Sequence, residues 1–247
     1  MGGLKDVKLI VDGKRLDGRT VEDLRQIKMQ VGVISEADGS AFIEWGGNKI
    51  ICGVYGPREC IPRHEANPFR AIVKCRYMMS PFASLEEHGR SGPSRRSTEL
   101  SKVIREVFQN VILADEFPNT EIDVYIDVLQ ADGGTRTASI TVAALALANA
   151  GIPMKDMVTA VAVGKGGDEL LVDLGKLEDN FGQSDMPLAF SAKDKKLLLV
   201  QMDGLLTLEE IEKILEMAER GADKVSAMQV EALRKYYVKD EETKFKL

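Results

Sequence analysis

The stretch that decides the fold is residues 121–149, EIDVYIDVLQADGGTRTASITVAALALAN. Apolar and polar side chains alternate over 121–130, which is the period-2 pattern of a half-buried strand. The glycine turn 132–134 follows, and the alanine-rich run 135–149 ends before Gly151, which predicts a helix. Small residues on all sides of this helix indicate that neighbouring elements pack closely around it.

Further elements lie on both sides of this stretch. Strand patterns cover 26–34 and 41–55, and the break at Gly46-Gly47-Asn48 predicts a hairpin. Apolar residues at helical spacing predict a helix over 95–113, after an exposed Ser-, Gly- and Pro-rich loop at 80–94. Short apolar runs predict the remaining strands, at 69–79, 158–163, 169–173, 187–191 and 196–202.

The C-terminal part is predicted to be one long helix. Thr207 and Glu210 have the spacing of a capping box, and the helical pattern reaches about Tyr236. We expect the tail, about 238–247, to be frayed. No low-complexity linker interrupts the 247 residues, so we expect a single α+β domain with mixed β-sheets layered with α-helices, and an N-terminal extension of about residues 1–20.

Composition is that of an ordinary soluble globular protein, with 44% hydrophobic and 29% charged residues. No long apolar run could serve as a signal peptide or cross a membrane, so we expect no membrane association. The three cysteines, Cys52, Cys60 and Cys75, lack the spacing of a metal site. A reduced, cytoplasmic setting is therefore expected.

Positive charge is concentrated in one part of the chain. The net charge is −6, yet residues 58–105 hold ten basic and five acidic side chains and so carry +5, which leaves −11 for the rest. A basic patch on an acidic body suits a protein that holds a polyanion at one place. Taken singly, each of these arginines is as well explained by a solvated surface.

Two helix starts carry arginines where the helix dipole disfavours cations. Arg95 and Arg96 open the first helix, and Arg136 follows Gly134 and Thr135 at the start of the second. Arginine forks and free helix N–H groups both bind phosphate oxygens, and glycine lets backbone approach a ligand. The alternatives are a solvated arginine pair and a tight strand–helix turn, but two such starts in one chain favour a shared anion site.

An acidic segment, EDNFGQSD at 178–185, is the third candidate. It is predicted to be a loop in which Asp179 and Asp185 are free to converge, one as proton donor and one as ligand of a divalent cation. The alternative is an acidic surface loop. His64 and His88 fall in no GxSxG or HExxH motif, so the reactions that remain are those of arginines, carboxylates and a metal ion, phosphoryl transfer foremost.

Five blocks together resemble the RNase PH family, in order and across nearly the whole chain. They are DGKRLDGR (12–19), GPRE (56–59), GPSRRSTEL (92–100), LQADGGTRTASI (129–140) and EDNFGQSDMP (178–187). More narrowly, RLDGR, ADGGTR and SDMP are similar to the catalytic RNase PH-type subunit of the archaeal exosome. The resemblance implies the RNase PH fold, which is ribosomal-protein-S5-domain-2-like. It also implies a phosphate-dependent 3′→5′ exoribonuclease that releases nucleoside diphosphates and runs in reverse as 3′ tailing.

The resemblance also implies roles for individual residues. Arg95 and Arg96 would grip the RNA backbone near the cleaved bond. Thr135 and Arg136, after Gly134, would bind inorganic phosphate, the co-substrate. Asp179 would be the proton donor and Asp185 the ligand of Mg²⁺ (or Mn²⁺), with Asp179 near the same metal.

Partners follow from the resemblance as well. Arg63 and His64 lie in a segment, IPRHEANP, that faces the pore in this family, which implies contacts with single-stranded RNA. The family implies a hexameric ring, a trimer of heterodimers with an inactive paralogue, carrying S1/KH-type RNA-binding cap proteins. Two alternatives remain: a stand-alone RNase PH that trims tRNA 3′ ends, and a non-catalytic RNA-binding ring subunit.

Overall fold

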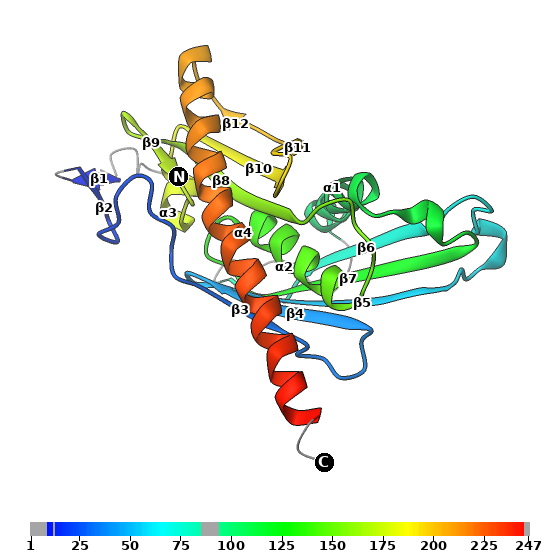
Figure 1. The fold of residues 1–247 in the computed structure, drawn as a ribbon. Coiled ribbons are helices and arrows are strands. Elements are labelled where there is room, and N and C mark those ends of the chain that lie inside the picture. Colours follow the sequence, from blue (N-terminus) through cyan, green and yellow to red (C-terminus); the bar gives the residue numbers. More distant parts are fainter. Residues whose placement is uncertain (1–8, 12, 85–93, 245–247) are drawn as a thin grey trace.

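The computed structural model describes residues 9–11, 13–84 and 94–244 (Figure 1). Its strands are β1 (Ile10–Val11), β2 (Lys14–Arg15), β3 (Ile27–Val31), β4 (Gly39–Trp45), β5 (Asn48–Glu59), β6 (Ile72–Met79), β7 (Thr120–Gln130), β8 (Val158–Gly166), β9 (Glu169–Val172), β10 (Ser184–Ser191), β11 (Leu197–Val200) and β12 (Asp203–Gly204). Its helices are α1 (Arg95–Val111), α2 (Thr135–Asn149), α3 (Lys176–Phe181) and α4 (Leu208–Lys244), with short 3-10 turns η1 (Arg63–Glu65) and η2 (Ala114–Glu116).

One sheet has the strand order β3-β4-β5-β7-β6. The predicted hairpin is confirmed, since Trp45 pairs with Asn48 across the Gly46-Gly47 turn. Strands β6 and β7 are parallel and are connected through α1, whereas the other neighbours are antiparallel. The carboxyl ends of β6 and β7 therefore meet at one edge of the sheet, and the starts of α1 and α2 follow from that edge.

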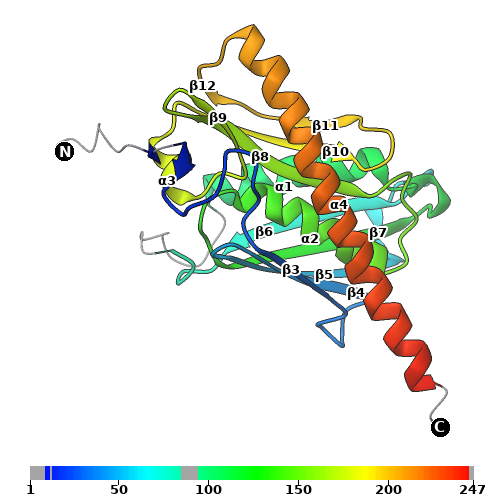
Figure 2. The ribbon, with the colours of Figure 1, turned by 60° about the vertical axis from the view of Figure 1, so that its left-hand side comes forward.

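The second sheet has the order β11-β10-β8-β9, and β12 pairs with β10. Helices α1 and α2 lie between the two sheets, as Figures 1 and 2 both show: α2 contacts β4, β5 and β8, and α1 contacts β6 and β11. Twelve of the fifteen residues of α2 are buried, which confirms the close packing that its small side chains predict.

Helix α4 packs across β8 and β9 and reaches β3. Ile214, Ala218 and Ala222 of α4 are buried against apolar side chains of the second sheet. The predicted capping box is present: Thr207 N–H donates to Glu210 Oε2 over 2.8 Å, and Glu210 N–H donates to Thr207 Oγ1 over 3.3 Å. In the part of the chain that the structure describes, no helix is long and apolar enough to cross a membrane.

The predicted α+β fold class is confirmed, but some local predictions are wrong. Residues 178–185 are not one loop, because Asp179 lies in helix α3 and Asp185 in strand β10. Helix α4 also continues past Tyr236 to Lys244, since residues 237–244 include no glycine or proline to stop it. Residues 85–93 of the predicted loop 80–94, with His88, lie outside the described residues.

Candidate active site

One cleft of about 570 Å³ collects most of the residues singled out in the sequence. It lies between the starts of α1 and α2 on one side and α3, β10 and β12 on the other. The predicted site residues that line it are Arg95, Arg96, Gly134, Thr135, Arg136, Asp179 and Asp185. The two helix starts and the acidic pair, up to about 90 residues apart in sequence, therefore share one site.

The two helix starts differ in how their N–H groups are satisfied. At α1 the Ser94 hydroxyl accepts from Ser97 N–H over 3.0 Å, so a side chain caps this end. At α2 the N-cap is Gly134, in the left-handed conformation with φ 66°, and no side chain caps the helix. Glycine has no side chain with which to cap, so the first N–H groups of α2 are available to an anion.

Thr135, the first residue of α2, is buried and places its hydroxyl beside Tyr77. The Tyr77 hydroxyl donates to Thr135 Oγ1 over 3.3 Å. An accepting Thr135 oxygen keeps its own hydrogen free to donate to a bound anion. Burial raises the pKa of Tyr77, so the phenol stays protonated as that donor.

Arginines supply the positive charge of the cleft. The Arg136 guanidinium lines the cleft and lies 3.9 Å from Glu99 Oε1. Among the described residues, Arg95 and Arg96 have no carboxylate partner in a salt bridge, and both are exposed. They are therefore available to an anionic ligand that enters the cleft.

The other wall carries carboxylates from three elements. Asp179 projects from α3, Asp185 from β10, and Asp203 from β12, where it pairs in register with Asp185. Burial, reinforced by the Asp179 charge, raises the pKa of Asp185 to about 7. Burial also raises the pKa of Asp179, although the charges of Arg96 and Arg136 oppose that shift. Perturbed carboxyls beside arginines in a cleft are typical of a functional site.

The carboxylates suit Mg²⁺ only in part. Within the residues that the structure describes, no group of three or more His, Cys, Asp or Glu side chains is arranged to hold a metal ion. Mg²⁺ prefers hard oxygen ligands and is usually held by one or two carboxylates together with water and substrate phosphates. Asp179 and Asp185 would therefore suit an Mg²⁺ ion that also binds water and substrate phosphates. They do not provide enough ligands to hold the ion by themselves.

Sequence reasoning missed several residues of the cleft. Asn180 and Asp203 line it, and Tyr77 supports it from β6. Asn180 directly follows Asp179 and could have been found from that neighbour. Asp203 and Tyr77 had no such signal, because only the pairing of β12 with β10 and of β6 with β7 brings them to the cleft.

Arg63 and His64 are not part of the cleft. They lie in η1, after the end of β5 that pairs with the start of β7, whereas α2 follows the opposite end of β7. At about 3.3 Å per residue, the eleven residues of β7 separate the two places by roughly 30 Å. Arg63 is exposed and donates to Glu59 Oε1 over 2.6 Å.

The predicted basic patch is only partly present. Arg58 pairs with Asp123, and Lys74 donates to Glu121 over 2.7 Å, so acids outside the segment 58–105 neutralise much of its charge. The sequence count could not show these pairs, because they form across neighbouring strands of the sheet. Among the described residues of this segment, the positive charge that faces the cleft is that of Arg95 and Arg96.

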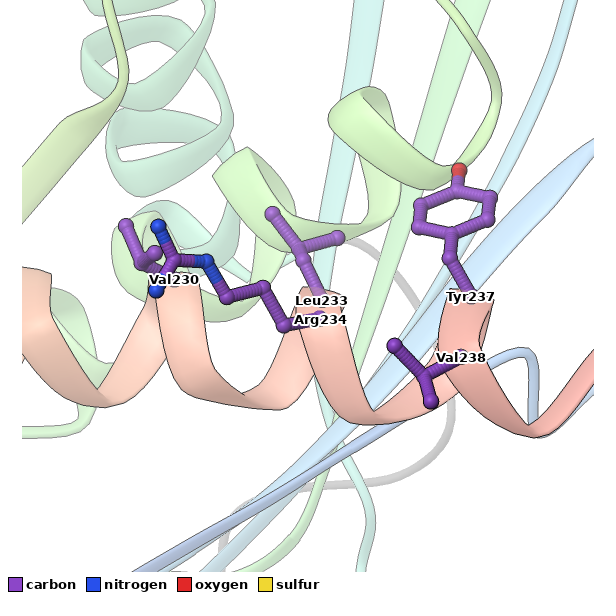
Figure 3. Close-up of a pocket in the computed structure, with 5 residues that line it drawn as sticks. All are labelled: Val230, Leu233, Arg234, Tyr237 and Val238. Atoms are coloured by element: carbon purple, nitrogen blue, oxygen red, sulfur yellow. The ribbon is translucent and has the colours of Figure 1, made fainter.

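A second hollow, of about 310 Å³, lies along the C-terminal half of α4 (Figure 3). Its lining residues are Val230, Leu233, Arg234, Tyr237 and Val238. The surface is mainly apolar, and its lining has one cation and no carboxylate, so it offers no acid–base or metal chemistry. The cleft between α1, α2 and β10 is the candidate active site because it brings the arginines of two helix starts together with the carboxyls whose pKa is raised.

An uncapped helix start and arginines opposite paired carboxylates are typical of sites that bind phosphate esters and act on them. The chain belongs to the RNase PH family of 3′ exoribonucleases. Domain 1 of the 3′ exoribonuclease family matches residues 23–153, and domain 2 of the same family matches residues 156–221. The family resemblance seen in the sequence is thereby confirmed.

Curated relatives cover almost the whole chain. The "Exosome complex component Rrp41" of Thermococcus kodakarensis is 52% identical over 240 residues, 97% of this chain and 96% of that protein. The protein of the same name from Archaeoglobus fulgidus is 49% identical and covers 95% of this chain and 92% of its own. That from Thermoplasma acidophilum is 50% identical, with 95% of each chain covered.

Two solved structures share the fold. Rice Rrp46 superimposes with a TM-score of 0.81 at 24% identity and covers 89% of this chain and 100% of its own. A chain of the Archaeoglobus fulgidus exosome with RNA bound to the active site has a TM-score of 0.76 at 24% identity, with 87% and 92% covered. At this identity the likeness concerns the fold, which confirms the predicted RNase PH fold.

Proposed function

We propose that this chain is the catalytic subunit of an archaeal exosome and that it shortens RNA from the 3′ end by phosphorolysis. The observation that carries the proposal is the single cleft in which the uncapped start of α2 and the arginines of α1 share a cavity with Asp179 and Asp185. The relatives named as exosome components support the assignment, since each is about half identical over nearly the whole chain.

In the proposed reaction, the terminal phosphodiester of RNA lies against Arg95 and Arg96, which neutralise its charge. Inorganic phosphate binds at the start of α2, on the Thr135 hydroxyl, the Arg136 guanidinium and the free N–H groups after Gly134. An oxygen of this phosphate attacks the terminal phosphorus in line, and the bond to the 3′ oxygen of the preceding nucleotide breaks. The released nucleoside carries both phosphorus atoms and leaves as a diphosphate.

Asp179 donates the proton that the departing 3′ oxygen requires. Its raised pKa supports this role, because a carboxyl that holds its proton closer to neutral pH is a better general acid. Asp185, with Asp179 close by, would hold Mg²⁺ (or Mn²⁺). The metal, when bound, offsets negative charge that develops on the phosphate oxygens. The reverse reaction adds nucleotides from diphosphates to a 3′ end, with Asp179 then accepting the proton.

The proposal extends to the assembly and to its location. We place the chain in a hexameric ring, a trimer of heterodimers with an inactive paralogue, carrying S1/KH-type cap proteins and taking in single-stranded RNA. Arg63 and His64 would contact that RNA away from the cleft. The location would be the cytoplasm, because Cys52, Cys60 and Cys75 are all unpaired thiols, as a reducing compartment favours.

The test is a reconstitution of the full chain with its ring paralogue, RNA, Mg²⁺ and inorganic phosphate, with the products separated by chromatography. We expect nucleoside diphosphates, released only when phosphate is present. Asp179→Ala should reduce the rate by about 10² to 10⁴, the range for loss of a general acid. Arg95→Ala/Arg96→Ala should also lower the rate, and Lys102→Ala is its matched control, because Lys102 is a cation of α1 that pairs with Glu106 on the exposed surface.

Nucleoside monophosphates released without phosphate would overturn the proposal. Full activity of the chain alone, as a homohexamer, would favour the stand-alone RNase PH. Unchanged activity of both Asp179→Ala and Arg95→Ala/Arg96→Ala would favour the non-catalytic ring subunit.

A further inference from the structure

We propose that the segment of residues 15–25 positions both halves of the catalytic cleft: Arg25 fixes the phosphate-binding turn, and Arg15 fixes the helix that carries Asp179. The inference rests on the proposed function and adds two positioning residues to it. Neither arginine lines the cleft, so both would act through the backbone and side chains that they hold.

Arg25 holds the turn that precedes the phosphate site. It is buried, and its Nη1 donates to the carbonyl of Asp132 over 2.5 Å while Nη2 donates to that of Gly133 over 3.3 Å. These carbonyls belong to the two residues directly before Gly134, the N-cap of α2. Any movement of this turn changes where the first N–H groups of α2 and the Thr135 hydroxyl point.

Asn48 holds the same turn as well. Its amide donates to the Gly133 carbonyl over 2.6 Å and accepts from Asp132 N–H over 2.6 Å. Asn48 is fully buried at the start of β5. Two buried side chains therefore fix the turn, Arg25 from the segment 15–25 and Asn48 from the start of β5. A turn that only reversed the direction of the chain would not require these two side chains.

Arg15 holds helix α3 in an equivalent way. It is 2% exposed, and its Nε donates to Glu178 Oε1 over 2.6 Å, with Nη2 donating to the other carboxylate oxygen. Glu178 immediately precedes Asp179, and its Oε2 also accepts from Gly175 N–H over 2.8 Å at the start of the helix. The remaining Arg15 donors reach the carbonyls of Val172 and Asp173 over 2.6 and 2.7 Å.

Asp173 contacts both positioning arginines: its carboxylate accepts from Arg25, and its backbone carbonyl accepts from Arg15. Its carboxylate accepts from Arg25 Nη2 over 2.7 Å and from Arg25 N–H over 2.6 Å, and it also accepts from Arg19 Nη1 over 3.4 Å. Asp173 is 1% exposed and has a left-handed backbone, with φ 59°. Because the Asp173 carboxylate is buried and bonded to both Arg25 and Arg19, loss of one partner would leave a buried charge incompletely paired and would release the backbone that it holds.

The turn held by Arg25 and the helix start held by Arg15 are also in direct contact, at Gly133. A Cβ placed on Gly133 would lie 2.6 Å from both the Gly175 carbonyl carbon and the Lys176 nitrogen. The phosphate turn therefore rests on the backbone at the start of α3. Arg15 and Arg25 hold opposite sides of this contact, which sets the position of the phosphate relative to Asp179.

The test is the steady-state kinetics of the reconstituted complex, with KM for inorganic phosphate and kcat measured separately. Arg25→Lys keeps the charge but has one nitrogen in place of the fork, so we expect KM for phosphate to rise about tenfold with kcat changed less than about threefold. Arg15→Lys displaces Asp179 and should lower kcat at least about tenfold with KM for phosphate unchanged.

Two further variants separate positioning from folding. Arg25→Gln/Asp173→Asn removes both buried charges together, which avoids an unpaired buried acid, and should still raise KM for phosphate. Arg220→Gln breaks an exposed pair in which Arg220 donates to Glu22 over 2.8 Å. Glu22 belongs to the same segment but faces α4, so this control should leave both constants unchanged.

Titration calorimetry of the full chain with inorganic phosphate gives a readout that does not depend on catalysis. Arg25→Lys should weaken phosphate binding about tenfold, and Arg15→Lys should leave it unchanged. This split would support the inference even if the unsubstituted complex failed to phosphorolyse RNA. The inference is overturned if both variants only reduce the folded fraction, with unaltered KM and phosphate affinity in the remainder, or if Arg220→Gln gives the same changes.

Discussion

The environment of Asp185 lowers the stability of the folded protein through a single carboxyl of the cleft. Its carboxyl is half-buried on β10, beside the charge of Asp179, and its pKa is raised to about 7. The folded protein therefore binds this proton more tightly than the unfolded chain does. Such a carboxyl destabilises the folded state at every pH at which it ionises in the unfolded chain but stays protonated in the folded protein.

The free energy of unfolding should therefore depend on pH through Asp185. Below 3.8, the ordinary pKa of an aspartate, both states are protonated and Asp185 costs nothing; the cost grows as pH rises and is complete above about 7. We therefore expect Asp185→Asn to raise the free energy of unfolding at pH 8 by about 2 kcal/mol. This is roughly half of what the two pKa values would give without screening, because solvent screens a half-buried group.

Urea unfolding of the metal-free protein at pH 4 and pH 8 measures this difference. The exposed Asp127→Asn on β7 is the control and should change neither value. Equal stability of Asp185→Asn and the unsubstituted protein at pH 8 would show that Asp185 is not held in a strained, desolvated state.

At the scale of elements, the cleft depends on how closely the 132–134 turn approaches α3. Gly133 has φ 73° and leaves no room for a Cβ against Gly175 and Lys176. Gly151, after α2, has nearly the same φ, 72°, but nothing lies within 4 Å of its Cβ position. Substitutions at the two glycines therefore differ in the crowding around the added Cβ but share the same backbone strain.

Gly133→Ala should therefore cost more than Gly151→Ala. Both substitutions carry the strain of a left-handed alanine, about 1 kcal/mol, and Gly133→Ala adds the displacement of α3, for a total of about 2–4 kcal/mol. Thermal unfolding of the two variants, together with phosphorolysis rates, checks this. Equal losses of stability in both would mean that the turn and α3 are not in the contact that the structure gives them.

Some helices and strands could be predicted from the sequence and others could not. The strand at 121–130 and the helix after it could be predicted because period and small residues encode them locally. The short helix α3 was missed: Gly175 N–H donates to Glu178 Oε2 at its start, but the Glu178 carboxylate that makes this cap is itself held by Arg15, 163 residues away. Strand β10 likewise begins three residues earlier than predicted, at Ser184, because β8 and β12 pair with its first residues.

For the whole molecule, the question is how the cleft relates to the distant η1 turn. Arg63 and His64 lie roughly 30 Å from the start of α2, a length set by β7. If RNA follows this path, only a chain long enough to span the distance contacts both places. Phosphate contacts add affinity without reading sequence.

Arg63→Ala/His64→Ala should weaken the use of long RNA and leave short RNA unaffected. We expect KM for a single-stranded RNA of about 30 nucleotides to rise about three- to tenfold, as for the loss of one or two phosphate contacts, with KM for a tetranucleotide unchanged. The effect should shrink as salt increases. A matched Lys28→Ala on the exposed face of β3 serves as the charge control. Equal changes for both RNA lengths would place these residues outside the RNA path.

The sequence by itself determined the main elements, the family and the types of residue at the two helix starts, because local periodicity and short motifs encode them. It singled out Arg95, Thr135 and Asp179 as candidate site residues but gave no distances between them. Only the tertiary structure decided that these residues share one cleft, that Asp203 also lines it and that Arg58 is paired with Asp123. The physical reason is that strand pairing, buried arginine–carboxylate bonds and the glycine contact at Gly133 act between residues far apart in the chain.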